Sequence, residues 1–325
     1  MKKRIRYFIV KNSTGPWSEE GRKLFANEIG KWGRVSVDYG SEREQEYEKY
    51  CKSIGEDCFK LSALIVKGKD IASVPFFHLC VDADRGYHLK RFAQLFAPGS
   101  ACNYSGKMIC SAGTRQIQKI EIDPKKRKNY DFMHVPYAYW ERLLIISRSL
   151  KELLEVNKIT GYRILPCLIA GKKYSKEEQS LEFTNDRLEQ EATHFQLMVT
   201  GKAINPETTI ATATDGYKCM KCGTLYFRSL YYPQVYGFSF FNPADLSEED
   251  LQITTECKFE GESRIFRREA QGILISGKLL HLLLKHKMKG IGSRMDDPVI
   301  KYPVAEVLGA TCDEMLLDEA RRLYC

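Results

Sequence analysis

Two cysteines of this 325-residue chain have the spacing of metal ligands. Cys219 and Cys222 are separated by two residues, and Gly223 follows them. Two thiolates at this spacing, with a glycine that permits a tight turn, form one half of a tetrahedral zinc site. Because a complete site needs two more ligands, the pair predicts either half of a zinc centre or a tight turn without metal.

A related motif lies in the first half of the chain, where Cys102 is followed by Ser105 and Gly106. Serine is a poor zinc ligand at neutral pH because its hydroxyl stays protonated. The remaining thiol of this region is Cys110, so a zinc site would consist of Cys102, Cys110, Cys219 and Cys222. We expect no bound cofactor and two tight turns, with zinc at these four cysteines as the alternative.

Each of these knuckles is followed by a segment that recurs 129 residues later. Leu-Ile-Ile-Ser at 144–147 matches Ile-Leu-Ile-Ser at 273–276, and the likeness continues without a gap to Gly161 and Gly290. Both segments predict a short apolar strand, a serine that caps a leucine-rich amphipathic helix, and a glycine that ends it. Ser147 and Ser276 are therefore predicted to be helix caps and not nucleophiles.

These observations predict an α+β fold of two diverged pseudo-repeats, each a Cys-x-x-[Cys/Ser]-Gly knuckle followed by a strand and a capped amphipathic helix. The boundary is placed in the polar stretch 172–191, which offers few residues to a core, giving an N-terminal half of 1–172 and a C-terminal half of 173–325. Other predicted strands are Arg4–Val10, Arg34–Asp38, Leu61–Val66, Val74–Val81, Gln116–Ile122, Gly161–Leu168 and Phe195–Thr200. Other predicted helices are Ser18–Lys31, Glu42–Ile54, Arg85–Phe96, Ser175–Glu191 and Cys312–Leu323.

The second predicted repeat helix carries a basic stripe beside its leucines. The stripe consists of Lys278, His281, Lys285 and Lys289, which recur at three or four residues. The aligned positions of the first repeat are Ser149, Glu152, Val156 and Thr160. Because the stripe belongs to one copy, it is the predicted partner-binding surface, for an acidic surface or a phosphate backbone. The aromatic run 226–241 could add interface anchors, although core packing explains it equally well.

The composition of the chain limits the classes of protein to which it can belong. The net charge is +8, and hydrophobic residues make up 43% of the chain, as in an ordinary globular protein. No apolar run is long enough to cross a bilayer. We therefore expect a cytoplasmic chain with no membrane partner, whose eleven cysteines are mostly buried, reduced thiols.

The sequence offers one arrangement for nucleophilic catalysis. His78, Cys80 and Asp82 alternate, so a strand would place all three on one face. An edge strand of mixed burial explains the same pattern. The phosphate-binding loop, the nucleophile elbow, the zinc-protease motif and the dinucleotide fingerprint are absent from the sequence. We therefore expect no enzymatic activity, with a cysteine-dependent hydrolase as a distant alternative.

The two knuckles, each followed by the strand and leucine-rich helix, resemble the double-CXXCG motif family of bacterial immunity proteins. The likeness is clearest over 102–161 and 195–290, and Ser105 departs from the motif. It implies a non-catalytic protein that binds and neutralises a cognate polymorphic toxin. The main alternative is a zinc-knuckle nucleic-acid-binding protein, favoured by Cys219, Cys222 and the positive charge; we expect no nucleic-acid partner.

Overall fold

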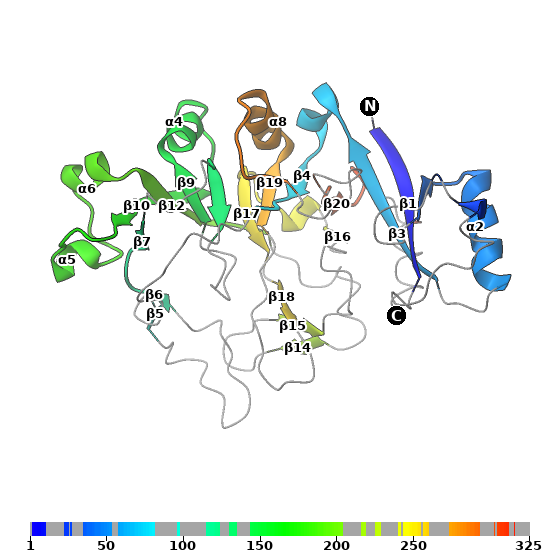
Figure 1. Ribbon diagram of the computed structural model, residues 1–325, viewed down its shortest axis with the longest axis horizontal. Coiled ribbons are helices and arrows are strands. Elements are labelled where there is room, and N and C mark those ends of the chain that lie inside the picture. Colours follow the sequence, from blue (N-terminus) through cyan, green and yellow to red (C-terminus); the bar gives the residue numbers. More distant parts are fainter. Residues whose placement is uncertain are drawn as a thin grey trace.

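The structure is a computed structural model, and it describes residues 2–10, 23–25, 27, 35–53, 58–81, 96–97, 115–123, 130–134, 144–203, 216–218, 225–228, 240–241, 243–254, 256–259, 273–292, 302, 304–311 and 315. These residues form a mixed α+β fold with several small sheets (Figure 1). No helix among them is long and apolar enough to cross a membrane.

Two four-stranded sheets form the centre of the described structure. The first has the order β10-β12-β9-β8 and the second the order β13-β17-β19-β4. The strands of the first are β8 (Phe132–His134), β9 (Leu144–Ser147), β10 (Tyr162–Pro166) and β12 (His194–Val199). The strands of the second are β4 (Phe76–His78), β13 (Gly201–Ala203), β17 (Leu251–Thr254) and β19 (Ile273–Ser276).

Two helices follow the central strands directly, and both lie on the same side of the strands in Figure 1. Helix α4 covers Arg148–Val156 after β9, and helix α8 covers Gly277–Lys285 after β19. Leu150 and Leu154 of α4 and Leu279 and Leu283 of α8 are fully buried in one hydrophobic cluster with both sheets. The helices form where the sequence places leucines three and four residues apart, because that spacing gives one apolar face.

Ser147 and Ser276 cap these helices, as predicted. Each hydroxyl accepts a hydrogen bond from the backbone N–H three residues on, at 3.1 Å from Leu150 and 3.1 Å from Leu279. The positive φ at the end of each helix belongs to Lys158 (50°) and Lys287 (56°), directly after the C-caps, whereas Gly161 and Gly290, with φ angles of 85° and 95°, lie further along the chain. The predicted strand and serine-capped helix are therefore confirmed in both segments, and the prediction that a glycine ends the helix is wrong.

A three-stranded sheet of order β2-β1-β3 and helix α2 form the N-terminal part. The bounds are β1 Lys2–Val10, β2 Val35–Asp38, α2 Glu42–Ser53 and β3 Cys58–Val66, close to the predicted elements. Phe25, Val35 and Tyr47 are buried in a separate small cluster between this sheet and α2. Cys51 of α2 is disulfide-bonded, so the expectation of reduced thiols is wrong at this position.

Smaller elements complete the described chain. Short pairs or triplets of strands are β5 (Phe96–Ala97) with β6 (Arg115–Gln116), β7 (Glu121–Ile122) with β11 (Leu168–Ile169), β14 (Gly216–Lys218) with β15 (Leu225–Arg228) and β18 (Glu256–Phe259), and β16 (Phe240–Phe241) with β20 (Glu306–Val307). Two 3-10 helices cover Gly68–Ser73 (η1) and Pro243–Asp245 (η5).

The segment 175–191 differs from the single helix predicted for it. It forms two short helices, α5 (Lys176–Gln179) and α6 (Asp186–Glu191), each started by its own cap at Ser175 or Asn185. Leu181 and Leu188 are buried, so the segment also packs better than its composition suggested. The chain between the helices is drawn to Gln118, with which Ser180 forms a β-bridge. This long-range pairing interrupts the predicted helix.

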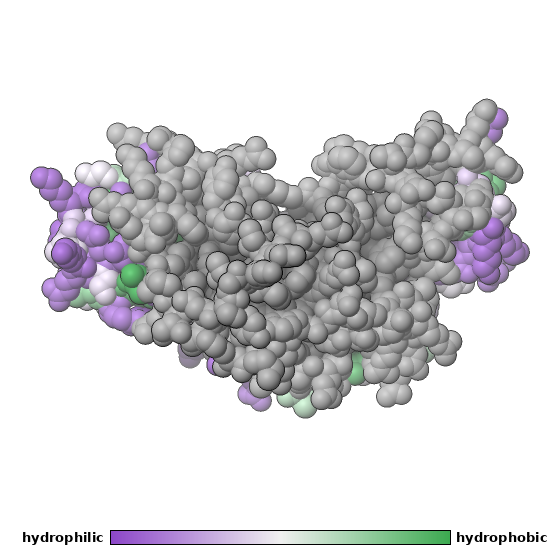
Figure 2. Space-filling view, turned by 90° about the horizontal axis from the view of Figure 1, so that it is seen from below, coloured by the Kyte–Doolittle hydropathy of each residue, from purple (hydrophilic) through white to green (hydrophobic). Residues whose placement is uncertain are grey.

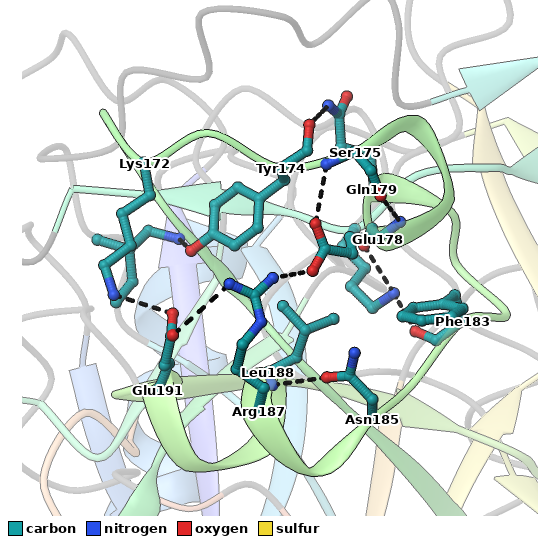
Figure 3. A network of polar contacts seen from close by, with 12 residues as sticks. Lys172, Tyr174, Ser175, Glu178, Gln179, Phe183, Asn185, Arg187, Leu188 and Glu191 are labelled. Carbon is teal, nitrogen blue, oxygen red and sulfur yellow. Dashed lines mark hydrogen bonds and ion pairs between the residues drawn. The ribbon is translucent and has the colours of Figure 1, made fainter.

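Polar contacts hold the two short helices together (Figure 3). Arg187 lies between the carboxylates of Glu178 and Glu191 and pairs with both, and Glu191 also accepts from Lys172 at 2.9 Å. In the space-filling view, hydrophilic side chains gather at the end that carries α5 and α6 and at the opposite end, over α2 (Figure 2). These groups are mostly solvated, so the network orders the turn and adds little stability.

The remaining predicted strands and helices are confirmed only in part. The predicted strand 116–122 consists of β6 and β7, separated by residues 117–120, and Phe96 belongs to β5 instead of a helix. The predicted strand 74–81 is a strand only over Phe76–His78, with an isolated bridge at Val81. Most of the predicted helices 18–31, 85–96 and 312–323 lies outside the described residues.

Candidate functional site

The basic stripe is carried by a helix whose position is fixed at its first residue. Strand β19 delivers buried Ile273, Leu274 and Ile275 to the sheet, and Ser276 then caps α8. The Ser276 hydroxyl donates to Asp250 Oδ1 at 2.6 Å, and its backbone N–H donates to the Asp250 carbonyl at 2.8 Å. Two contacts therefore fix the start of α8 to Asp250, the residue directly before β17.

A second constraint acts at Gly277, where α8 touches η1. A Cβ atom at this position would overlap the carbonyl oxygens of Ile71 and Val74, so only glycine allows this approach. Leu279, Leu280 and Leu283 are at most 1% exposed and face the core. Both the rotation and the axial position of α8 are thus set, and its opposite face is presented to solvent.

The predicted stripe lies on that solvent-facing side. Lys278, Lys285 and Lys289 are exposed, and His281 is half-buried between the leucines and the lysines. Among the described residues, two acidic groups approach the stripe: Asp131 Oδ2 accepts a hydrogen bond from the Lys289 backbone N–H at 3.0 Å, and Asp250 Oδ2 lies 3.7 Å from Lys278 Nζ. Since the Lys278 side chain is 62% exposed, this contact is screened by water and leaves the charge available.

Tertiary packing adds charges that the pattern had not singled out. His286 and Lys287 are exposed in the turn after α8, and the segment 277–292 contains no acidic residue at all. Lys67 and Lys69 are also exposed. Lys67 directly precedes η1 and Lys69 belongs to it, and η1 packs against α8. Helix periodicity indicates His286 and Lys287 only weakly, and no sequence signal connects Lys69 to a helix two hundred residues away. We call the stripe together with these four residues the basic face.

The equivalent side of α4 differs in charge. Ser149, Glu152, Val156 and Thr160 occupy the aligned positions, and all four are exposed. Lys151 is paired with Glu155 at 3.0 Å and with Glu189 at 2.9 Å, so positive charge on α4 is balanced locally. The basic face is therefore specific to α8, while the helix scaffold beneath it is common to both.

The predicted cysteine ligands cannot be placed. Cys102, Cys110, Cys219 and Cys222 all lie outside the described residues. Within the described part of the chain, no group of three or more His, Cys, Asp or Glu side chains is arranged to hold a metal ion. Two tight turns without metal stay the prediction for the knuckles, with zinc as the alternative.

The candidate nucleophile is described in part. His78 ends β4 and lies 6.4 Å from the Phe241 ring, measured between ring centroids, while Cys80 follows the strand and is half-buried. Asp82 lies outside the described residues. Because β4 ends before Cys80, the regular alternation that would align the three side chains extends only over 76–78. Most of the aromatic run 226–241 is likewise outside the described residues, apart from 226–228, 240 and 241.

Comparison with models of known protein families and with the sequences of curated proteins finds no match to this chain.

Proposed function

We propose that this chain is an immunity protein, which neutralises a cognate bacterial toxin by binding it and not by catalysis. The observation that carries the proposal is the basic face: exposed lysines on a helix that is fixed at its cap, at Gly277 and by buried leucines, with no acidic residue in 277–292. A rigid surface with an excess of positive charge gives fast association and selectivity for a partner of opposite charge. The resemblance of the knuckle, strand and helix order to the double-CXXCG family supports the same reading.

A protein partner fits this face better than nucleic acid. The cations are lysines and histidines without an arginine, whereas arginine provides the bidentate recognition of phosphates and bases that dominates nucleic-acid interfaces. The chain's excess of positive charge is also modest, at +8. The zinc-knuckle nucleic-acid binder remains the alternative, and it predicts an affinity for DNA or RNA that falls steeply with salt.

We also propose that the fold consists of two diverged copies of one unit. The matched strands, the serine-capped helices and the lysines of positive φ that follow their C-caps, in 144–161 and 273–290, support this duplication. Such an origin explains how one copy could gain a charged face while the other kept the same scaffold. The knuckles belong to the proposed unit through their sequence alone.

The test is protection against the toxin encoded beside the gene for this chain. We expect co-expression to rescue growth and the two purified proteins to form a one-to-one complex. Lys278→Glu, Lys285→Glu and Lys289→Glu combined should weaken that complex at least about tenfold and abolish rescue, because three attractive charges become repulsive. Raising the ionic strength should mainly slow association of the unmodified protein.

The matched control changes the same number of charges elsewhere. Lys173, Lys176 and Lys202 are exposed and lie away from α8, so replacing all three by glutamate should leave rescue intact. A stripe variant that binds and protects like the unmodified protein would show the basic face to be wrong as the interface. Failure of the unmodified protein to bind or protect would remove the immunity proposal itself.

A further inference from the structure

Two strands of the central sheets pair with partners far from them in the sequence, and in the same register. Phe77 of β4 faces Ile275 of β19, and Phe195 of β12 faces Ile146 of β9. Ile275 and Ile146 occupy aligned positions of the two serine-capped segments. Strands β4 and β12 therefore have equivalent places in their sheets, although β4 precedes its partner in the chain and β12 follows its own.

The equivalence continues beyond the first pair. Val199 pairs with Tyr162 immediately after Gly161, and Val81 pairs with Ile291 immediately after Gly290. The strands also share a sequence pattern, Phe-x-Leu-x-Val, at 77–81 and at 195–199. In β12, Phe195 and Leu197 are buried and Val199 packs against the same core cluster. In the first half Phe77 of β4 is buried in that cluster, and Leu79 and Val81, beyond the end of β4, are partly buried against it.

The chain order of these features is the same in each half. In the first half, 77–81 is followed by Asp131, Ser147 and Gly161; in the second half, 195–199 is followed by Asp250, Ser276 and Gly290. The two series are separated by 118, 119, 129 and 129 residues, so one extra residue before Asp250 and an insertion of ten residues between Asp250 and Ser276 account for the change. Each half thus contains one complete set of the same elements.

We infer that the two proposed copies exchange their first strands. The strand 76–78 of the first copy completes the sheet of the second, by pairing with β19. The strand 194–199 of the second copy completes the sheet of the first, by pairing with β9 and β10. This inference rests on the proposed duplication and is independent of the toxin.

Two aspartates form a reciprocal clasp between the copies. Asp131 accepts from the Ser147 hydroxyl of its own copy at 2.8 Å through Oδ1, and from the Lys289 backbone N–H of the other copy at 3.0 Å through Oδ2. Asp250 accepts from Ser276 of its own copy at 2.6 Å and from the Thr160 N–H of the other at 3.2 Å. Each aspartate therefore supports the cap of one helix and the segment that follows the end of the other.

The exchange has a consequence for folding. Neither sheet is complete within one half of the chain, so neither half can bury its leucine-rich helix alone. The halves should fold as one cooperative unit, and the base of the basic face depends on residues 71–77 from the first half. The exchanged strands make 1–172 and 173–325 interlocked segments.

The first test cuts the full chain after it has folded. A protease site inserted after Gly171 lies in a turn where a Cβ would meet nothing within 4 Å. After cleavage, the two fragments should co-elute at the size of the intact protein and unfold in a single transition. Two folded fragments that separate under native conditions would overturn the exchange, whatever the outcome of the toxin experiment.

The second test detects the clasp in the uncut protein by hydrogen exchange. In Asp131→Ala, amides near Leu150 and also near Lys289, in the other half, should exchange about tenfold faster, the effect of losing one hydrogen bond of about 1.4 kcal/mol. Asp186→Ala, at an exposed position in the first turn of α6, is the control and should leave both regions unchanged. Faster exchange confined to Leu150 would contradict the reciprocal clasp.

Discussion

At the scale of single residues, Lys119 is a charged group that is buried and makes three hydrogen bonds. Its side chain is 2% exposed, and Nζ donates to the carbonyl oxygens of Glu178, Ser180 and Phe183. Burial, together with the nearby charge of Arg163, lowers the pKa of Lys119 to about 8, and Glu182 opposes the shift. One lysine thereby gathers the chain between α5 and α6 onto the strand region that precedes β7.

We predict that Lys119→Met lowers the free energy of unfolding by about 1–3 kcal/mol at pH 7, because three carbonyls lose their donor. The folded pKa of about 8 lies below the ordinary value of 10.5, so between these values the unfolded chain binds more protons. The unfolding free energy of the unmodified protein should therefore rise relative to that of the variant from pH 8 to 10.5. Denaturant titrations at several pH values measure this difference, and a constant gap would refute the shifted pKa.

At the scale of elements, the helix ends show how closely the central strands approach. Gly161 and Gly290 have positive φ, and a Cβ at either would overlap a backbone carbonyl, that of Leu251 or of Phe132. Gly171 has a similar φ of 87° with nothing within 4 Å. Substitution at Gly171 therefore measures the cost of a left-handed backbone alone. Substitution at Gly161 or Gly290 measures that cost together with the cost of a steric overlap.

We predict that Gly171→Ala costs about 1 kcal/mol of unfolding free energy, the penalty for an L-residue at positive φ. Gly161→Ala and Gly290→Ala should cost about 1–3 kcal/mol more, because the facing strand must also move. Chemical denaturation with matched m-values measures all three. Equal losses at the three positions would show that the overlap is relieved without cost.

At the scale of the whole molecule, the question is whether a bound metal ion contributes to the stability of the fold. The cysteines with ligand spacing lie in parts of the chain outside the described residues, and Ser105 weakens one of the two knuckles. The described core, by contrast, is built from apolar side chains of both central sheets and from α4 and α8. That core provides stability which does not depend on a metal site.

We predict that the purified protein contains no stoichiometric zinc and that Cys219→Ser leaves its melting temperature unchanged. The physical reason is that a serine hydroxyl does not replace the thiolate that a structural zinc site needs. Elemental analysis and thermal unfolding with and without a chelator check both points. Near-stoichiometric zinc, lost in the variant together with stability, would place Cys102, Cys110, Cys219 and Cys222 in one structural site.

The sequence by itself determined the local structure of the elements with the strongest patterns. Leucine spacing and the caps Ser147 and Ser276 specify helices α4 and α8 because caps and amphipathic faces act within a few residues. The predicted glycine ends were wrong, because each helix ends before a lysine of positive φ, Lys158 or Lys287. The basic stripe followed from the same periodicity. In 175–191 local propensity favoured one helix, but the bridge to Gln118 and the carbonyl contacts of Lys119 outweighed it.

Only the tertiary structure decided which strands pair. β-pairing joins residues that can lie anywhere in the chain. An apolar alternation such as Phe-x-Leu-x-Val indicates which face of a strand is buried, but it does not indicate which strand is its partner. Thus the sequence shows that 77–81 and 195–199 share one pattern. The structure shows that each segment pairs with the strand that precedes the capped helix of the other half of the chain. The same long-range packing brings η1 and its lysine to α8, because Gly277 leaves room for backbone to approach.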